Sequence, residues 1–151
     1  KDAIRLPRFG FDFELTKNTK DFTYFGFGPI ESYCDMNHGA LMGMYDSNVD
    51  KEYVEYVRPQ DHGNHYNTKY LKIGKLCFTG DSFEFNVSKY STHALFNAWH
   101  TDELIEDDKT HLRIDYKVSG IGSASCGPDL NERYKLNDKQ IEFKFQISPV
   151  L

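Results

Sequence analysis

The chain has 151 residues, with 18 basic and 23 acidic side chains and a formal net charge of -5. This balance, without any local cluster of Lys and Arg, argues against partners such as nucleic acid or an anionic membrane surface. The length favours a single domain, and a mean hydropathy of -0.63 with no long apolar run argues against a membrane span.

Alternation of apolar and polar residues is the main pattern along the chain. It is clearest in residues 9–15, 82–87, 111–118 and 140–147, and weaker in residues 21–27, 51–57, 67–73 and 76–79. Successive side chains of a strand point to opposite faces, so each run places its apolar residues on one face. One-sided alternation is typical of antiparallel sheets packed face to face. We therefore predict an all-β fold, an antiparallel β-sandwich.

The apolar members of the four clear runs are expected to form one contiguous core. Its predicted centre consists of Phe11, Phe13, Phe85, Ile114, Tyr116, Phe143 and Phe145. One short helix is predicted over residues 92–99, because Ser91 is a good N-cap and Leu95, Ala98 and Trp99 follow helical spacing. Residues 28–48 and 119–130 lack a strand pattern, and long loops in a compact domain are often functional.

Residues 58–65, Arg-Pro-Gln-Asp-His-Gly-Asn-His, crowd six polar side chains into one turn. Recognition of a sugar uses planar amides, carboxylates and imidazoles of this kind, but an ordinary solvated turn has the same composition. Gly63 permits a positive φ. His62 and His65 form an H-x-x-H pair, but the spacing supplies no third or fourth ligand, so no metal site is predicted here.

The second unusual loop, residues 119–128, is rich in Gly, Ser and Pro. No convincing helix follows it, so it is not predicted to bind phosphate. Cys126 has no basic neighbour to lower its pKa, which argues against a catalytic thiolate. Three cysteines without zinc or disulfide spacing fit a reduced, cytoplasmic chain. In residues 26–35, Glu31 and Asp35 are placed to accept hydrogen bonds, but no carboxylate pair stands out as a glycosidase acid and nucleophile.

Read together and in order, these segments resemble the C-terminal domain of the large bacterial β-galactosidases of glycoside hydrolase family 2. The resemblance rests on five segments that run along most of the chain: 6–11 (LPRFGF), 24–35 (YFGFGPIESYCD), 56–64 (YVRPQDHGN), 83–91 (FEFNVSKYS) and 115–128 (DYKVSGIGSASCGP).

The resemblance implies a β-sandwich of the supersandwich, galactose-mutarotase-like type, of which residues 1–151 form the second half as a single domain. It implies a longer parent, a retaining β-galactosidase that hydrolyses terminal β-D-galactosides such as lactose. The family's catalytic glutamates lie on a TIM barrel and its Mg and Na ligands lie outside the matched region. The chain by itself is therefore expected to be inactive and to hold no cofactor. Its expected partners are the remainder of the enzyme chain and the galactoside, within a homo-oligomer.

The same resemblance assigns a role at the rim of the active site to Pro59, Gln60, Asp61, His62, Gly63 and Cys126. Two departures from the family pattern occur: Asp61 stands where Glu is usual, and Cys126 falls where some members have a substrate-stacking tryptophan. We expect residues 58–65 and 119–128 to meet in space. The alternative is a free-standing carbohydrate-binding or interaction β-sandwich, which a reading frame that encodes an upstream barrel would rule out.

Overall fold

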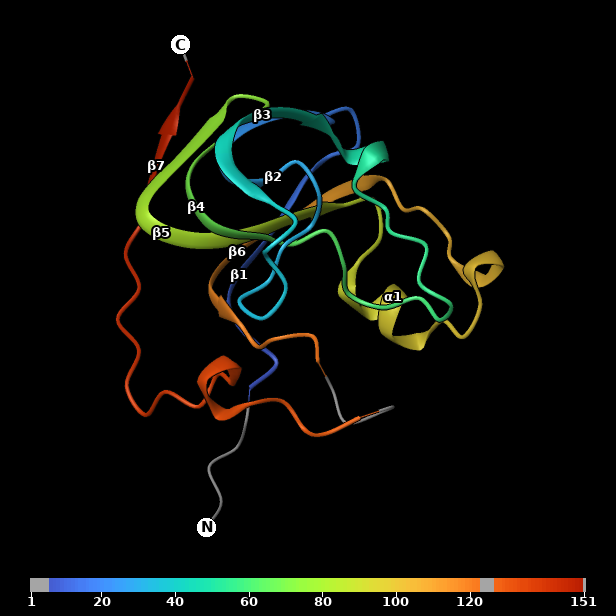
Figure 1. Ribbon diagram of the computed structural model, residues 1–151. Helices are drawn as coiled ribbons and strands as arrows, with labels where there is room; N and C mark the ends of the chain where they lie inside the picture. Colours follow the sequence, from blue (N-terminus) through green and yellow to red (C-terminus); the bar gives the residue numbers. More distant parts are fainter. Residues whose placement is uncertain (1–5, 123–126, 151) are drawn as a thin grey trace.

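The computed structural model describes residues 6–122 and 127–150. In these ranges the chain is built mainly of antiparallel strands, which confirms the predicted all-β sandwich class (Figure 1). The strands are β1 (Arg8–Thr16), β2 (Asp21–Gly28), β3 (Leu41–Asn48), β4 (His65–Ile73), β5 (Leu76–Ser88), β6 (Lys109–Val118) and β7 (Gln146–Pro149). The helical segments are η1 (Val49–Lys51), α1 (Thr92–Asn97), η2 (Thr101–Glu103) and η3 (Glu132–Tyr134).

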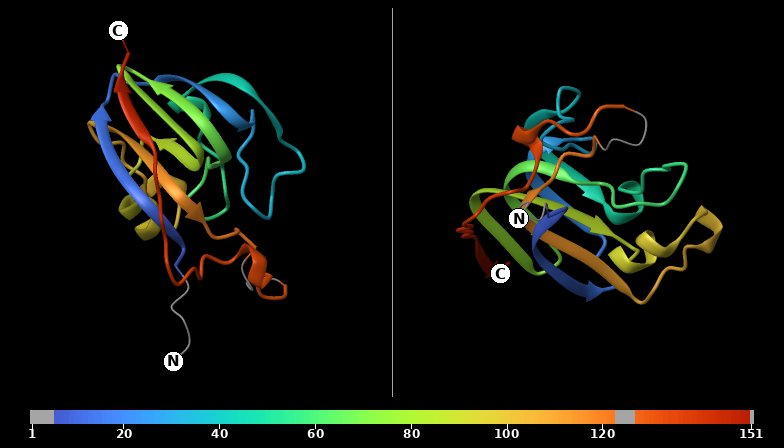
Figure 2. Two further views of the ribbon diagram at one scale, coloured as in Figure 1. Left: turned by 90° about the vertical axis from the view of Figure 1, so that its left-hand side faces the viewer. Right: turned by 90° about the horizontal axis from the view of Figure 1, so that it is seen from below.

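The strands hydrogen-bond in the order β1-β6-β5-β4-β2-β3, and β7 pairs with β5 outside this path. The 13-residue β5 is the central strand: it pairs with β4 from Leu76 to Phe85, while its other edge pairs first with β7 and then with β6. Figures 1 and 2 show that the sheet is strongly curved, so that strands distant in pairing order surround a common core. The loops and α1 gather toward the lower end in Figure 1.

The core combines apolar side chains from β2, β4, β5 and β6 with Val49 of η1. Its members are Phe22, Tyr24, Val49, Leu71, Ile73, Phe78, Phe83, Phe85, Val87, Leu112 and Ile114. Aromatic rings join the strands, as where Phe22 meets Phe85 edge to face with centroids 5.8 Å apart. Such contacts add to the hydrophobic stabilisation that burial provides.

The predicted core centre is correct for Phe85 and Ile114, which are fully buried. Four further members are only partly buried: Phe13, Phe143 and Phe145, which pack against the core, and Tyr116. Phe11 is a wrong prediction, because 53% of it is exposed. Phe11 lies on the core side of β1, but its ring contacts there Phe13, Phe143 and Phe145, which are themselves only partly buried at the margin of the core.

Three strand predictions require correction. Residues 51–57 continue from η1 as irregular chain, and residues 141–145 form no ladder before β7 begins at Gln146. Conversely, β3 lies in the stretch 28–48 that lacked a strand pattern. This strand pairs with β2 alone and buries none of its side chains, so its sequence needs no apolar alternation.

The predicted helix is present but shorter, as α1 ends at Asn97. Ser91 is its N-cap, since the Ser91 side chain accepts a hydrogen bond from the Ala94 N–H. Leu95 and Ala98 are buried as expected, whereas Trp99 is exposed. Within the described ranges no helix has the length and apolar character needed to cross a membrane.

Candidate functional site

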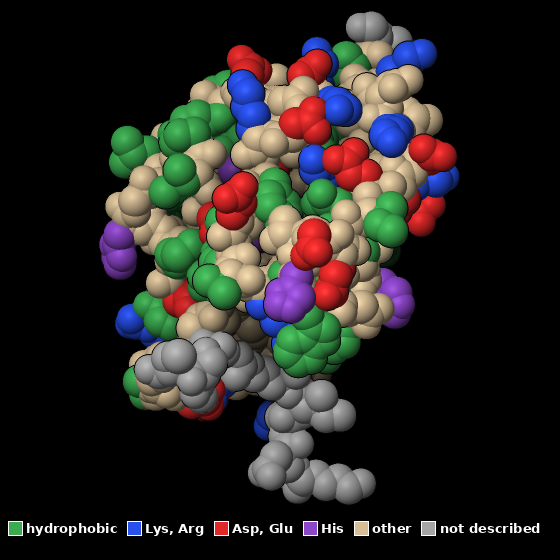
Figure 3. Space-filling view, turned by 90° about the vertical axis from the view of Figure 1, so that its right-hand side faces the viewer, with side chains coloured by type: hydrophobic (Ala, Val, Ile, Leu, Met, Phe, Trp, Pro, Cys, Tyr) green, Lys and Arg blue, Asp and Glu red, His purple; other side chains and the backbone are tan. Residues whose placement is uncertain are grey.

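Residues 58–64 form the last part of the loop that joins η1 to β4, and His65 is the first residue of β4. This turn lies against the polar face of β5 and β6. Pro59, His62 and Gly63 are buried, Asp61 is half-buried and Gln60 is exposed. The predicted positive φ at Gly63 is present, at +69°. Cys126 lies outside the described residues. Figure 3 shows the side of the molecule on which carboxylates, histidines and hydrophobic side chains are mixed at the surface.

Asp61 is held by two arginines and one amide. It forms an ion pair with Arg8, its Oδ1 lies 3.7 Å from Arg113 Nη1, and the same oxygen accepts a hydrogen bond from Asn86 Nδ2 at 3.1 Å. Arg8 also pairs with Asp115 of β6. These contacts fix the middle of the turn to β1, β5 and β6. They hold it firmly because hydrogen bonds between charged groups are stronger than those between neutral groups.

Glu31 fixes the next part of the turn. Its carboxylate accepts hydrogen bonds from the Gly63 N–H at 2.9 Å, from the Tyr33 hydroxyl at 3.1 Å and from the Tyr56 hydroxyl. Glu31 was expected to act as a hydrogen-bond acceptor in its loop, and the structure assigns it partners from two loops.

Glu84 of β5 links this turn to the end of β6. Asn64 Nδ2 donates to Glu84 Oε2 at 2.7 Å, and the Val118 N–H donates to Glu84 Oε1 at 3.2 Å. Burial of this side chain raises the pKa of Glu84 to about 7. Glu84 therefore lies between Asn64, in the 58–65 turn, and Val118, which precedes the 119–128 loop. Its carboxyl group is expected to change its protonation state near neutral pH.

Asp35 holds the described part of the second loop. Its carboxylate accepts hydrogen bonds from the Ile121 N–H at 3.1 Å and the Gly122 N–H at 2.9 Å. A Cβ at Gly120 would lie 2.5 Å from the Asp35 carboxyl carbon, so this close approach requires glycine. Glu84 thus links residues 58–65 to Val118, the residue before the second loop. Contact between residues 58–65 and the second loop itself stays a prediction.

The two histidines of the H-x-x-H pair have separate partners. His62 Nδ1 lies 2.8 Å from the Gln60 carbonyl oxygen, whereas His65 Nε2 lies 2.8 Å from Glu52 Oε2. Among the described residues no group of three or more His, Cys, Asp and Glu side chains is arranged to hold a metal ion.

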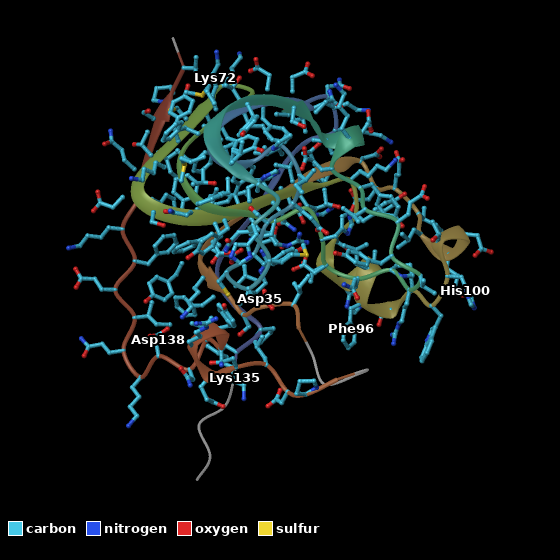
Figure 4. All side chains as sticks on the ribbon, in the orientation of Figure 1. Asp35, Lys72, Phe96, His100, Lys135 and Asp138 are labelled. Carbon is cyan, nitrogen blue, oxygen red and sulfur yellow. The ribbon has the colours of Figure 1, made fainter. Side chains whose placement is uncertain are left out.

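A small cleft of about 250 Å³ opens beside the turn. It is lined by Arg58, Pro59, Gln60, Asp61, Thr92 and Phe96. Phe96 is 76% exposed, and Figure 4 shows it on α1 below the sheet. The Arg58 guanidinium carbon lies 4.0 Å from the centroid of the exposed Trp99 ring. An aromatic wall beside an amide and a carboxylate suits a sugar, which has both an apolar face and hydroxyl groups.

The sequence predicts neither Phe96 in the lining of this cleft nor the exposed Trp99 that stacks on Arg58. Helical spacing places Trp99 on the apolar face of the predicted helix, together with Leu95 and Ala98. The available signal was the position of Phe96 next to Leu95: adjacent helical residues point in directions about 100° apart, and Leu95 already faces the core.

The structure thus defines the protein as an all-β antiparallel domain. Loops cover one polar face of its sheet, and the carboxylates of Glu31, Asp35, Asp61, Glu84 and Asp115, with Arg8 and Arg113, hold these loops in place. The family is shown by comparison: residues 1–147 match the model of the β-galactosidase small chain. The chain belongs to this family.

Similar proteins include three β-galactosidases. That of Actinobacillus pleuropneumoniae is 42% identical over 143 residues, covering 94% of this chain and 14% of that protein. The β-galactosidase of Staphylococcus xylosus is 40% identical over 150 residues, which cover 96% of this chain and 15% of that protein. The β-galactosidase of Kluyveromyces lactis is 33% identical over 148 residues, which cover 95% of this chain and 14% of that protein. The chain thus spans about one seventh of the length of these relatives.

Proposed function

We propose that this chain is the C-terminal part of a retaining β-galactosidase of glycoside hydrolase family 2, one that hydrolyses terminal β-D-galactosides such as lactose. Within that enzyme it forms part of the active-site rim and contacts the sugar. The observation that supports this proposal most strongly is the match to the β-galactosidase small chain over residues 1–147.

The rim consists of the cleft beside the 58–65 turn, together with the second loop that ends near Cys126. Gln60 and Asp61 offer hydrogen-bonding groups at the cleft, and Phe96 offers a stacking surface. Pro59, His62 and Gly63 are buried, so they shape the turn from beneath. The rim residues orient the sugar and exclude water. Because they act at a distance from the reacting bond, they change the affinity for the substrate and not the chemical step.

The chemistry itself belongs outside this chain. A retaining mechanism needs an acid and a nucleophile about 5 Å apart. Here the buried or half-buried carboxylates of Glu31, Asp35, Asp61 and Glu84 are each engaged by N–H or O–H donors. Within residues 6–122 and 127–150, no group of three or more His, Cys, Asp and Glu side chains is arranged to hold a divalent cation. By the family resemblance we expect the Mg and Na ions to be held by the parent enzyme and not by this chain, and we expect the parent to be a homo-oligomer.

A graft tests the proposal. In this experiment the matching segment of the A. pleuropneumoniae β-galactosidase is replaced by the present chain, and hydrolysis of o-nitrophenyl β-D-galactoside is measured. The graft is expected to be active, whereas the same enzyme truncated before the segment and the purified 151-residue chain are expected to be inactive. A folded graft with no activity, or turnover by the purified chain, would refute the proposal.

A further inference from the structure

The outer face of the sheet, away from the core, is apolar where β2, β3 and β4 lie side by side. In the β2–β3 ladder Phe25 lies opposite Met44 and Phe27 lies opposite Met42, and in the β2–β4 ladder Phe25 also lies opposite Tyr70. Residues directly opposite each other in an antiparallel ladder point to the same side of the sheet. The residues of β2 that alternate with the two phenylalanines are buried. The five side chains therefore share the outer face.

Tyr66 extends this face, since its ring centroid lies 5.9 Å from that of Phe27. We call the set the outer patch; it consists of Phe25, Phe27, Met42, Met44, Tyr66 and Tyr70. Met44 is 60% exposed and Met42 is 38% exposed, and the four aromatic residues are partly exposed. A contiguous apolar surface of this kind on a folded domain marks a site of interaction.

The outer patch has the composition and the border of a protein interface. Aromatic residues and methionine are the types enriched at the centre of interfaces, where charged residues are depleted. Polar residues follow at one end of the same ladders, where Thr23 lies opposite both Asp46 and Lys72. The Thr23 hydroxyl donates to Asp46 Oδ1 at 2.6 Å. An apolar centre with a polar rim is the arrangement that a packed protein surface requires.

The edge of the sheet beside the outer patch is unprotected. β3 pairs with β2 alone and forms the margin of the sheet (Figure 2). Edge strands of soluble domains usually carry charged residues or proline, which prevent pairing with other chains. Residues 41–45, Leu-Met-Gly-Met-Tyr, have neither. This second observation indicates that the same part of the sheet is covered in the complete protein.

The relatives indicate what covers it. The matched segment is 14% of the A. pleuropneumoniae β-galactosidase, so most of such a parent lies outside this chain. A sheet with an apolar face buries it against a further layer of structure. A layer that belongs to the same chain is present at a high effective concentration, which favours it over a second, separate copy of this chain.

We propose that the outer patch is the surface on which a part of the parent enzyme outside these 151 residues packs, through apolar side chains of its own. The inference rests on the proposed function only in that it requires a longer parent. The outer patch shares no residue with the cleft of the proposed rim.

The three methionines of the chain allow a test without substitution. Met42 and Met44 belong to the outer patch, while Met36 lies outside it and is as exposed as Met42, at 38%. The purified chain and the grafted enzyme are treated with hydrogen peroxide, and the rate of sulfoxide formation at each methionine is measured by peptide mass spectrometry. Oxidation of Met42 and Met44 is expected to be at least ~10-fold slower in the graft, and that of Met36 to change less than ~2-fold.

A pair of substitutions on β3 gives a second readout. Met44→Asp is expected to make thermal inactivation of the graft at least ~5-fold faster, because it buries an unpaired charge, and to leave the unfolding midpoint of the purified chain unchanged. Leu41→Asp is the matched control. Leu41 is 73% exposed and lies opposite Gly28, so its side chain is on the other face of β3, and the rate should change less than ~2-fold.

Each outcome decides the proposal. An active graft that oxidises at Met42 and Met44 as fast as the purified chain would overturn it and leave the proposed function intact. Equal protection of all three methionines, or equal effects of the two substitutions, would also overturn the assignment to this face. A purified chain that is a dimer, and that Met44→Asp converts to a monomer, would assign the outer patch to a second copy instead. A folded but inactive graft in which Met42 and Met44 alone are protected would refute the proposed function and support this surface.

Discussion

Glu84 is expected to make the stability of the domain depend on pH. The residue is 3% exposed, and burial raises its pKa from the ordinary 4.5 to about 7, although the hydrogen bonds from Asn64 and Val118 favour the charged form. Between these two pH values the folded state keeps the proton and the unfolded state releases it. The contribution of Glu84 therefore lowers the free energy of unfolding as pH rises through this window. At about 1.36 kcal/mol per pH unit, the interval corresponds to roughly 3 kcal/mol.

The measurement is urea unfolding of the chain and of Glu84→Gln at several pH values from 4.5 to 8. Glutamine does not titrate, so the free energy of unfolding of Glu84→Gln relative to the unmodified chain should increase by roughly 3 kcal/mol across that range. Taking the difference removes the contributions of all other titrating groups. Glu55→Gln, at an exposed position, is the matched control for the effect of the Glu to Gln substitution itself. A flat or falling difference for Glu84→Gln would refute the reasoning.

Three further substitutions test the packing and the loop network. Phe85→Ala should lower the free energy of unfolding by about 3–5 kcal/mol because the ring is fully buried, while Phe96→Ala should change it by less than about 0.5 kcal/mol; equal effects in urea unfolding would contradict the core assignment. Glu31→Gln should cost roughly 1–3 kcal/mol and reduce hydrogen-exchange protection of the Gly63 amide, and unchanged protection would argue against this contact. Gly63→Ala should destabilise by about 1 kcal/mol or more, because φ is +69° and the added Cβ would lie 3.0 Å from a carbonyl oxygen, whereas Gly127→Ala, with open space around it, should be near neutral by thermal unfolding.

Strands that bury one face could be predicted from the sequence, since alternation records that burial. This holds for β6, where Leu112 and Ile114 enter the core. It fails for β3, an edge strand without buried side chains, and for residues 141–145, where Phe143 and Phe145 pack against the core from a segment outside any strand. In that segment the alternation reflects one-sided packing without a hydrogen-bonded ladder.

The turn chemistry of the candidate site could be predicted better than its partners. Gly63 adopts the expected positive φ, and Glu31 accepts hydrogen bonds as expected. The pairing of Arg8 with Asp61 was beyond prediction, because 53 residues separate them and only the strand order brings them together. Arg113 Nε and Nη2 are buried without a hydrogen-bond partner in the structure, and the ordinary alternation of β6 does not predict this.

The most direct test of the proposed rim role is the effect of Gln60→Ala on the kinetics of the grafted enzyme. Gln60 is exposed and lines the cleft beside the turn, so its loss should remove binding without altering the chemical step. We predict an increase in KM for lactose of about 3-fold or more with kcat nearly unchanged, while Lys72→Ala, an exposed position on β4, leaves both constants as they were. A fall in kcat at constant KM, or no change in either constant, would contradict the assignment of this turn to the substrate rim.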